Sequence, residues 1–195
     1  MSHEHAHHGA KQPHIFSHEK AAWLDEPERE GWLPTPVLVA LLGVEPGMRV
    51  LDFGAGTGRY ALAIARAYPA SDVTAYDVQP EFLAMIDERA HAQQVPNVRT
   101  AAHLDTQFDR IFAANVLHEI GDEDLRIMRA ALAPGGIAVI VDWNAEIDRP
   151  TGPPREHAHT QKEAVARLMH AGFSQLKTVG EPKLPYHFVL AGLGD

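Results

Sequence analysis

VLDFGAGTGRYALAIAR, residues 50–66, is the stretch that decides the fold. An apolar run ends at Asp52, glycines follow at positions 54, 56 and 58, and the alanine-rich segment 59–68 has a helical composition. Glycine permits positive φ in a tight turn and lets a ligand approach bare backbone. The first free N–H groups of the helix point into the same space. The stretch therefore predicts a buried strand, a ligand-binding turn and a helix.

Asp77 is an acidic residue whose position fits this turn. It ends the predicted strand 72–77, 23 residues beyond Gly54. In a doubly wound sheet that place lies beside the glycine turn, where a carboxylate can accept both hydroxyls of a ribose. Turn and carboxylate together predict a ligand with an adenosine-type ribose. The glycines taken alone would also suit a tight strand-to-helix connection without a ligand.

The spacing of the glycines distinguishes between two kinds of cofactor-binding site. Dinucleotide sites carry G-x-G-x-x-G, whereas this chain has G-x-G-x-G preceded by Asp52. A carboxylate at the strand end suits a cationic amino-acid group better than a pyrophosphate. S-adenosylmethionine carries an ammonium and a sulfonium and no phosphate, so the charge argument favours it over NAD.

Strand and helix patterns alternate along the chain, which predicts an α/β fold with a doubly wound, mostly parallel seven-stranded sheet. The closing strands are joined by EPKLP, which is too short for a helical crossover, so we expect an antiparallel C-terminal hairpin. The predicted strands are 48–53, 72–77, 97–102, 108–115, 137–143, 173–180 and 186–192, with the turn APGG before the fifth. The predicted helices begin at a Thr35 cap, at 59, at Pro80, at an Asp122 cap and at a Thr160–Glu163 capping box.

The composition suits one packed domain, because the chain has 195 residues, of which 45% are hydrophobic. We expect a single domain over residues 18–195, with 18–45 as an N-terminal helical segment. Residues 1–17 read as a flexible tail, since six of the 13 histidines fall within the first 18 residues. This tail would either bind divalent metal ions weakly or have no specific role.

Charge and composition exclude several classes of function. The 17 Lys and Arg against 26 Asp and Glu give a net charge of -9, which disfavours nucleic acid as a partner. The chain has no cysteine, so thiolate metal sites and thiol nucleophiles are absent. No apolar run approaches the ~18 residues of a membrane span. We expect a cytoplasmic protein with a small-molecule partner and no membrane contact; nothing in the sequence indicates an oligomeric state.

The chain resembles the class I S-adenosylmethionine-dependent methyltransferases, and most closely the broad group that includes quinone-biosynthesis enzymes. The matching motifs are VLDFGAGTGRYALAIAR, Asp77 in YDVQPEFL, FDRIFAANVLHEI and the LAPGG turn, and the resemblance covers roughly residues 45–192. It implies methyl transfer by in-line displacement, here to a small organic acceptor such as a hydroxylated or quinone-like ring.

The resemblance also implies the residues that bind the cofactor. The glycine turn would line the methionine portion, Asp77 and Val78 would hold ribose and adenine, and the residues after strand four would lie beside the cofactor. Where relatives carry an acidic residue followed by an apolar one, this chain has Ala102-His103-Leu104-Asp105, so His103 and Leu104 would meet the adenine. The full expected set is Asp52, Gly54, Ala55, Gly56, Thr57, Gly58, Asp77, Val78, His103, Leu104, Asn115 and Val116.

His118 and His157 are the catalytic candidates. Transfer from a sulfonium can be accelerated by alignment alone, and a base is needed only if the acceptor arrives protonated. His118 lies just beyond Asn115 and could be that base, or it could be a helix-start histidine bonded to a backbone carbonyl. His157, with His159, could orient an acceptor. We expect no metal site, because these histidines and His187 lack ligand spacing.

Two further alternatives concern the N-terminal segment and the function as a whole. Phe16, Trp23 and Trp32 precede the core and could form a lid over the acceptor site or a helix packed on the sheet edge. The functional alternatives are a non-catalytic cofactor-binding or metal-handling protein on the same fold and, less favoured, an NAD-dependent oxidoreductase.

Overall fold

The sheet holds seven strands, in the order β3-β2-β1-β4-β5-β7-β6. A computed structural model of the chain describes residues 16–181 and 183–194, so the predicted tail lies almost entirely outside the described residues. The strands are β1 (Arg49–Phe53), β2 (Asp72–Tyr76), β3 (Val98–Ala101), β4 (Phe108–Ala114), β5 (Leu132–Trp143), β6 (Ser174–Thr178) and β7 (His187–Leu193). The first five pair in parallel, and β7 is inserted antiparallel between β5 and β6. The doubly wound sheet and its antiparallel ending are confirmed.

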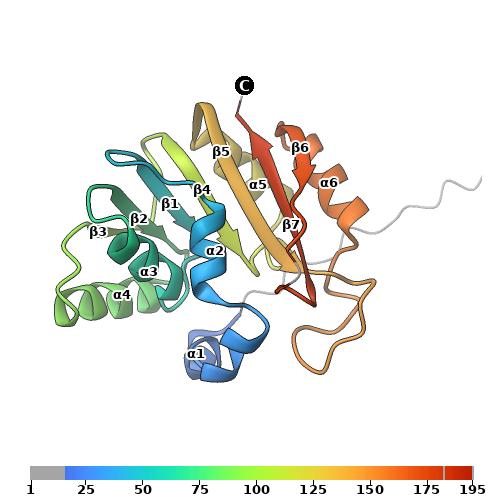
Figure 1. The fold of residues 1–195 in the computed structure, drawn as a ribbon, viewed down its shortest axis with the longest axis horizontal. Coiled ribbons are helices and arrows are strands. Elements are labelled where there is room, and N and C mark those ends of the chain that lie inside the picture. The colour runs from blue at the N-terminus through green and yellow to red at the C-terminus, as the bar shows by residue number, and fades with distance from the viewer. Residues whose placement is uncertain (1–15, 182, 195) are drawn as a thin grey trace, which may run out of the picture.

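Helices cover both faces of this sheet, as Figure 1 shows. One apolar core lies between the sheet and α2 (Thr35–Leu41), α3 (Arg59–Ala67) and α4 (Pro80–Ala92). The other lies between the sheet and α5 (Asp122–Ala130) and α6 (Gln161–His170). Burial on both faces explains why the central strands are almost continuously apolar, as in Val139, Ile140 and Val141.

Two predicted helix caps are wrong by one residue, and one is confirmed. Thr35 is the first residue of α2 rather than its cap, and its hydroxyl and N–H both contact Glu30. Asp122 is likewise the first residue of α5, after Gly121. Thr160 caps α6 by accepting from the Glu163 N–H, and Glu163 in turn accepts from the Thr160 N–H.

The predicted APGG turn before the fifth strand is replaced by a distortion within β5. Leu132 pairs with Phe108, and the next pair is Ile137 with Arg110, so several residues of β5 bulge out between two partners. Gly135 has φ +71 in this bulge. Strand β5 therefore begins five residues earlier than the 137–143 expected from hydropathy.

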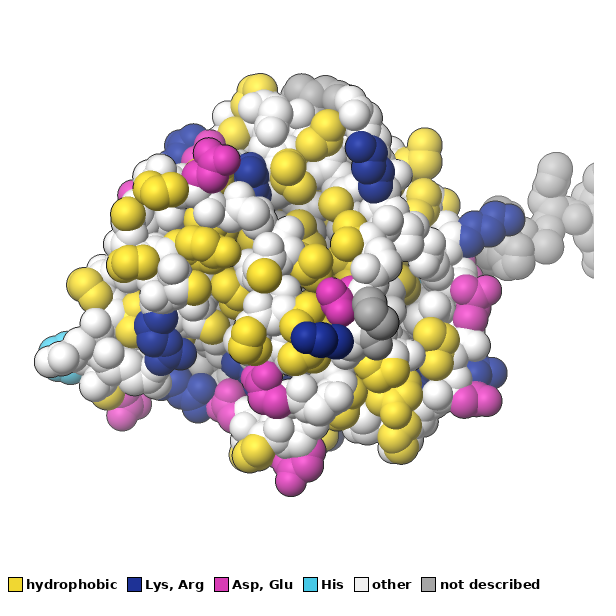
Figure 2. All heavy atoms as spheres, in the orientation of Figure 1, with side chains coloured by type: hydrophobic (Ala, Val, Ile, Leu, Met, Phe, Trp, Pro, Cys, Tyr) yellow, Lys and Arg dark blue, Asp and Glu magenta, His cyan; other side chains and the backbone are white. Residues whose placement is uncertain are grey.

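Short helical turns lie at the carboxyl edge of the parallel strands. They are η1 (His18–Lys20), α1 (Ala21–Leu24) and η2 (Pro27–Gly31), and they sit beside the loop that follows β5 (Figure 1). This edge is where open α/β sheets bind ligands. On the face that carries α2, α3 and α4, acidic and basic side chains are interspersed rather than gathered into a field of one sign (Figure 2). None of the helices in the described part of the chain is long and apolar enough to cross a membrane.

Candidate active site

The glycine turn after β1 is built around positive φ angles. Gly54, Gly56 and Gly58 have φ of +71, +51 and +78. A Cβ on Gly54 would lie 2.6 Å from Val116 Cγ2, and one on Gly58 would lie 2.7 Å from Ile86 Cγ1. Glycine is therefore required at both ends of the turn for space as well as for conformation.

Asp77, at the end of β2, stabilises this turn through hydrogen bonds. Its Oδ2 accepts from the Gly56 N–H at 2.9 Å, and its Oδ1 accepts from the Gln79 N–H at 2.9 Å. Burial raises the pKa of the carboxyl, and these N–H groups oppose the rise. The structure thus brings Asp77 beside the glycine turn, as the spacing of the two motifs predicts.

Asp52 lies beneath the turn and is 2% exposed. Burial raises the pKa of its carboxyl to about 7, against a donated hydrogen bond from the Ala61 N–H, and the nearby Asp77 adds to the rise. Its Oδ2 has no partner among the described residues. Asp52 therefore supports the turn from below and does not line the cavity above it.

A first cavity, which we call the cofactor cavity, lies over the glycine turn and has a volume of about 160 Å³. Of the expected cofactor-binding residues, Gly54, Ala55, Gly56, Thr57, Asp77, Val78, Asn115 and Val116 line it. Gly58, His103 and Leu104, like Asp52, are outside its lining; His103 is exposed and Leu104 packs against the α5–α6 core.

The cofactor cavity also contains residues that sequence reasoning missed. Arg29 and Leu24 reach it from the N-terminal turns, Tyr60 from α3, and Gln79 and Phe82 from the start of α4. Nothing in the local sequence marks these positions, because they meet only in the folded chain. Phe16 was identified as part of a possible lid, and it too lines this cavity.

A second cavity of about 730 Å³, which we call the acceptor cavity, adjoins the first. Its volume is within the range typical of small-molecule sites. The two cavities share Phe16, Leu24, Arg29, Asn115 and Glu119. The acceptor cavity is otherwise lined mainly by apolar groups and two histidines, namely Ala22, Trp23, Trp143, Gly152, Pro153, Pro154, His118 and His157, together with Lys20 and Thr151.

Asn115 marks the junction of the two cavities. It follows β4 with φ +58, a left-handed conformation that is uncommon for a non-glycine residue. Its backbone N–H donates to the Val141 carbonyl at 2.8 Å, while both polar atoms of its side chain are buried without a partner among the described residues. Buried polar groups are nearly always hydrogen-bonded in native proteins, so this amide has the capacity to bind a water or a polar group of a ligand.

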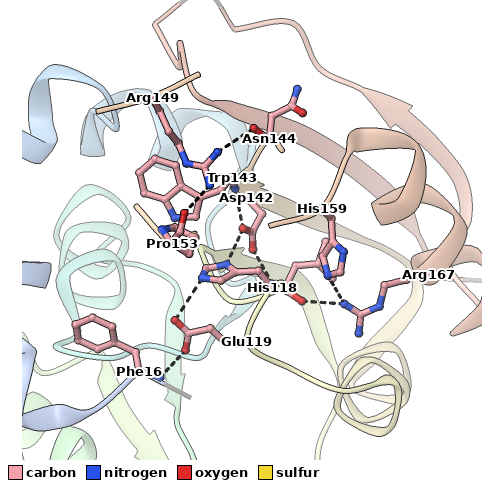
Figure 3. A network of polar contacts seen from close by, with 11 residues as sticks. Phe16, His118, Glu119, Asp142, Trp143, Asn144, Arg149, Pro153, His159 and Arg167 are labelled. Atoms are coloured by element: carbon pink, nitrogen blue, oxygen red, sulfur yellow. Dashed lines mark hydrogen bonds and ion pairs between the residues drawn. The ribbon is translucent and has the colours of Figure 1, made fainter. Parts of the chain in front are cut away.

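His118 and Asp142 form a buried pair at the wall of the acceptor cavity (Figure 3). His118 Nδ1 lies 2.8 Å from Asp142 Oδ1, and the His118 N–H donates to Asp142 Oδ2 at 3.2 Å. Burial lowers the pKa of His118, but the Asp142 carboxylate outweighs it and the net pKa is raised. The pKa of Asp142 is lowered, because the histidine and the Trp143 N–H outweigh its burial.

The ionised Asp142 therefore fixes the protonation of the histidine ring. Nδ1 carries the proton and donates to the carboxylate, which leaves Nε2 of the neutral ring as an acceptor. Glu119 Oε1 lies 3.5 Å from Nε2, and Glu119 Oε2 accepts from the Phe16 N–H at 2.9 Å. Burial raises the pKa of Glu119 against the influence of His118.

Arg167 of α6 holds the loop that carries His118. Its Nη1 donates to the Leu117 carbonyl at 3.0 Å and its Nη2 donates to the Ile120 carbonyl at 2.9 Å. Nη1 also lies 2.8 Å from His159 Nε2 (Figure 3). His159 is therefore engaged with the support of the loop rather than with an acceptor.

The remaining candidate histidines have separate places. His157 is exposed at the wall of the acceptor cavity. His187 is buried between Trp32 and Trp143, with ring centroids 5.7 and 4.2 Å away, and burial lowers its pKa to about 3. Within residues 16–181 and 183–194, no group of three or more His, Asp or Glu side chains is arranged to hold a metal ion.

Comparison with known proteins agrees with this architecture. Residues 50–136 match a family described as a methyltransferase domain. The chain is 30% identical over 181 residues to mouse acetylserotonin O-methyltransferase, covering 77% of this chain and 45% of that protein. It is 32% identical over 117 residues to trans-aconitate 2-methyltransferase of Variovorax paradoxus, covering 58% and 45%. The chain thus spans less than half the length of these curated relatives.

A solved structure covers nearly the whole chain. The S-adenosylmethionine-dependent methyltransferase of Aquifex aeolicus superposes with a TM-score of 0.82 at 26% identity, covering 93% of this chain and 100% of that one. The quinone-biosynthesis subgroup expected from the motifs stays a prediction. With the family match, the sheet order and the glycine turn in agreement, the chain belongs to the class I S-adenosylmethionine-dependent methyltransferases.

Proposed function

We propose that the chain methylates a hydroxyl group of a small, largely apolar molecule, with His118 as general base. The observation that carries the proposal is the His118–Asp142 pair at the wall of the acceptor cavity, which joins the cofactor cavity at Asn115. A histidine oriented by a buried carboxylate suits proton removal from an acceptor that arrives protonated.

The residues of the cofactor cavity fit S-adenosylmethionine, which when bound supplies a methyl group on a positively charged sulfur. The bare backbone of Gly54 and Gly56 admits close approach of a ligand. Asp77 accepts from the Gly56 and Gln79 N–H groups through different oxygens, and the carboxylate keeps a lone pair for a ribose hydroxyl. Val78, which is 56% exposed, offers an apolar surface to the adenine. The unpartnered Asn115 amide would contact the ligand near the junction.

The proton of the acceptor would pass to Nε2 of His118 as the oxygen attacks. Asp142 keeps its hydrogen bond to Nδ1 and stabilises the positive charge that forms on the ring. The raised pKa of His118 increases its strength as a base, and its neutral form prevails at a higher pH than that of an ordinary histidine. The carboxyl of Glu119, whose Oε1 lies 3.5 Å from Nε2, is a second group beside the charged ring.

The walls of the acceptor cavity favour a flat, apolar acceptor. Trp23 and Trp143 supply aromatic surfaces, and Pro153 and Pro154 supply further apolar contact. The mouse relative is an O-methyltransferase, which supports an oxygen acceptor. The acidic chain and its apolar cavity agree with a small-molecule partner rather than a nucleic acid.

The N-terminal turns would act as a cover for both cavities. Phe16, Leu24 and Arg29 line the two cavities together, and Trp23 faces the acceptor cavity. We therefore keep residues 18–45 as part of the single domain and assign residues 18–31 the role of a cover. Alignment and exclusion of water beneath such a cover assist a displacement reaction.

The test is transfer of radiolabelled methyl from S-adenosylmethionine to matched acceptors on the same aromatic ring, one carrying a hydroxyl, one an amine and one a carboxylate. We expect methylation of the hydroxyl compound and a loss of about 10²- to 10⁴-fold in kcat for His118→Gln. His157→Gln, at the exposed wall of the cavity, is the comparison for a histidine that only orients the acceptor and should affect mainly KM. Methylation of another group with unchanged kcat in His118→Gln would contradict the proposal.

A further inference from the structure

Arg29 is a buried cation with unused hydrogen-bond donors. It lies in η2 and is 4% exposed, yet its Nε and Nη1 have no partner among the described residues. Burial lowers its pKa, because removing a guanidinium from water disfavours the charged form. Leaving buried charged donors unpaired is costly, and native structures rarely do so without a reason.

The neighbouring carboxylates do not neutralise Arg29. Asp25 receives hydrogen bonds from the Arg89 guanidinium at 2.7 Å and the Thr57 hydroxyl at 2.8 Å. Glu30 is bound by Arg59 and by Thr35. No carboxylate of the described chain forms an ion pair with Arg29, although these other arginines of the same region have one.

The guanidinium of Arg29 is nevertheless held in a fixed place. Its central carbon lies 4.7 Å from the ring centroid of Trp23 and 5.0 Å from that of Trp32. Such contacts stabilise a cation over aromatic faces and leave the N–H groups at its edge free to donate. Tyr60 lines the same cavity, and its hydroxyl is buried close enough to Arg29 for each group to influence the pKa of the other, although the hydroxyl has no partner of full hydrogen-bond geometry among the described residues.

We propose that Arg29 and Tyr60 bind the α-carboxylate of the methionine portion of S-adenosylmethionine. The inference rests on the proposed function, in that this cofactor occupies the cofactor cavity. A planar guanidinium donates to a carboxylate through two parallel N–H groups, and a phenol can donate to the same group. The carboxylate is the one anionic group of the cofactor, so it is the part that a buried arginine would recognise.

Arg29 also borders the acceptor cavity, so a carboxylate on the acceptor is a second source of the same chemistry. Tyr60 decides between them, because it lines the cofactor cavity and is not part of the acceptor cavity. Gly54, Ala55, Gly56 and Thr57 line the cofactor cavity as well, and none of them lines the acceptor cavity. The cofactor carboxylate therefore fits the position of Arg29 better.

This contact would join cofactor binding to closure of the cover. Arg29 lies in the N-terminal turns, whereas Tyr60 lies in α3 behind the glycine turn. A carboxylate held by both residues would fasten the cover to the domain. Trp23 and Trp32 flank the guanidinium, so their fluorescence should report that contact.

The experiment compares S-adenosylmethionine with decarboxylated S-adenosylmethionine, which keeps the ammonium, sulfonium and adenosine. Calorimetric affinities are measured for the wild type, Arg29→Met and Arg29→Lys, with Arg126→Met as a surface control. We expect the wild type to bind S-adenosylmethionine about 10- to 100-fold more tightly than the decarboxylated compound, as one or two charged hydrogen bonds would give. Arg29→Met should abolish that difference by weakening only S-adenosylmethionine, and Arg29→Lys should keep part of it.

The outcomes separate the inference from its alternatives. Equal affinity of the wild type for the two compounds would overturn it, and this comparison needs no variant to fold. Equal weakening of both compounds by Arg29→Met would assign Arg29 a structural role and also overturn it. If Arg29→Met leaves the cofactor affinity unchanged and raises KM for a carboxylate-bearing acceptor, Arg29 binds the acceptor and the inference is overturned. Failure of the wild type to bind S-adenosylmethionine, S-adenosylhomocysteine or the decarboxylated compound would instead refute the proposed function.

Discussion

Replacing Asp52 by asparagine should stabilise the protein increasingly as the pH rises. Burial raises the pKa of the native carboxyl to about 7, from a value of 3.8 without the folded environment. Between these two values the native state keeps the proton that the unfolded state has lost. The free energy of unfolding contributed by Asp52 therefore falls as the pH rises through this window, and it levels off above about 7.

The magnitude follows from the same two pKa values. At about 1.36 kcal/mol for each pH unit, the rise from 3.8 to about 7 makes the ionised native state less stable by about 4 kcal/mol. Asparagine stays neutral at every pH, and its side-chain oxygen can still accept from the Ala61 N–H. The gain in unfolding free energy for Asp52→Asn over the wild type should therefore grow by about 4 kcal/mol between about pH 4 and about pH 8.

Urea unfolding followed by tryptophan fluorescence measures this difference across the pH range. Asp72→Asn, which removes an exposed carboxylate at the start of β2, is the matched control. A difference that does not change with pH for Asp52→Asn would refute the reasoning. It would mean that the Ala61 N–H and the glycine turn keep Asp52 ionised in the native state, as a fixed negative charge beneath the cofactor cavity.

Asp142→Asn should lower kcat by about 10²-fold or more. It should also move the pH midpoint of the remaining activity downward, because the Asp142 carboxylate raises the pKa of His118. An unchanged midpoint in the pH–rate profile would contradict the pairing of the two residues. Asp77→Ala should weaken S-adenosylmethionine binding about 10- to 100-fold in calorimetry by removing the ribose acceptor, and an unchanged affinity would place the ribose elsewhere. Gly58→Ala should lower the free energy of unfolding by about 2 to 4 kcal/mol, since φ is +78 and the new Cβ would meet Ile86. Gly43→Ala, with φ +53 and open space around it, should lose only about 1 to 2 kcal/mol in the same denaturation assay.

The sheet and the glycine turn could be predicted because their causes are local. The alternation of apolar strands with amphipathic helices sets the topology, and Gly54 and Gly58 combine positive φ with a neighbour that excludes a Cβ. Asp77 could be placed beside them because consecutive parallel strands bring their carboxyl ends together. The helix caps predicted at Thr35 and Asp122 are each wrong by one residue, because α2 and α5 begin at these residues, after Pro34 and Gly121, and the exact end of a helix is weakly marked in a sequence.

The pairing of His118 with Asp142 could not be predicted from either residue alone. His118 follows the predicted fourth strand, whereas Asp142 lies within the predicted fifth. Their contact depends on β4 and β5 being neighbours, with Ala114 opposite Val141, so that His118 in the loop after β4 lies beside Asp142 near the end of β5. The role of Arg29 could be predicted even less from the sequence, because it depends on hydrogen-bond donors that are left without partners after folding. Conversely, His103 was expected at the adenine by resemblance, and it is exposed outside the cavity lining.

The order of ligand binding follows from how closely the cover lies on the glycine turn. A Cβ on Gly56 would be 3.2 Å from Leu24 Cδ1, so α1 touches the turn itself. The cofactor cavity of about 160 Å³ is smaller than the roughly 300 Å³ at which small-molecule sites begin. We therefore expect the N-terminal turns to move outward when the cofactor enters, which would also open the acceptor cavity that Trp23 helps to line. Because the proposed Arg29 contact would draw the same turns back over the bound cofactor, a complete acceptor site would form only after the cofactor has entered.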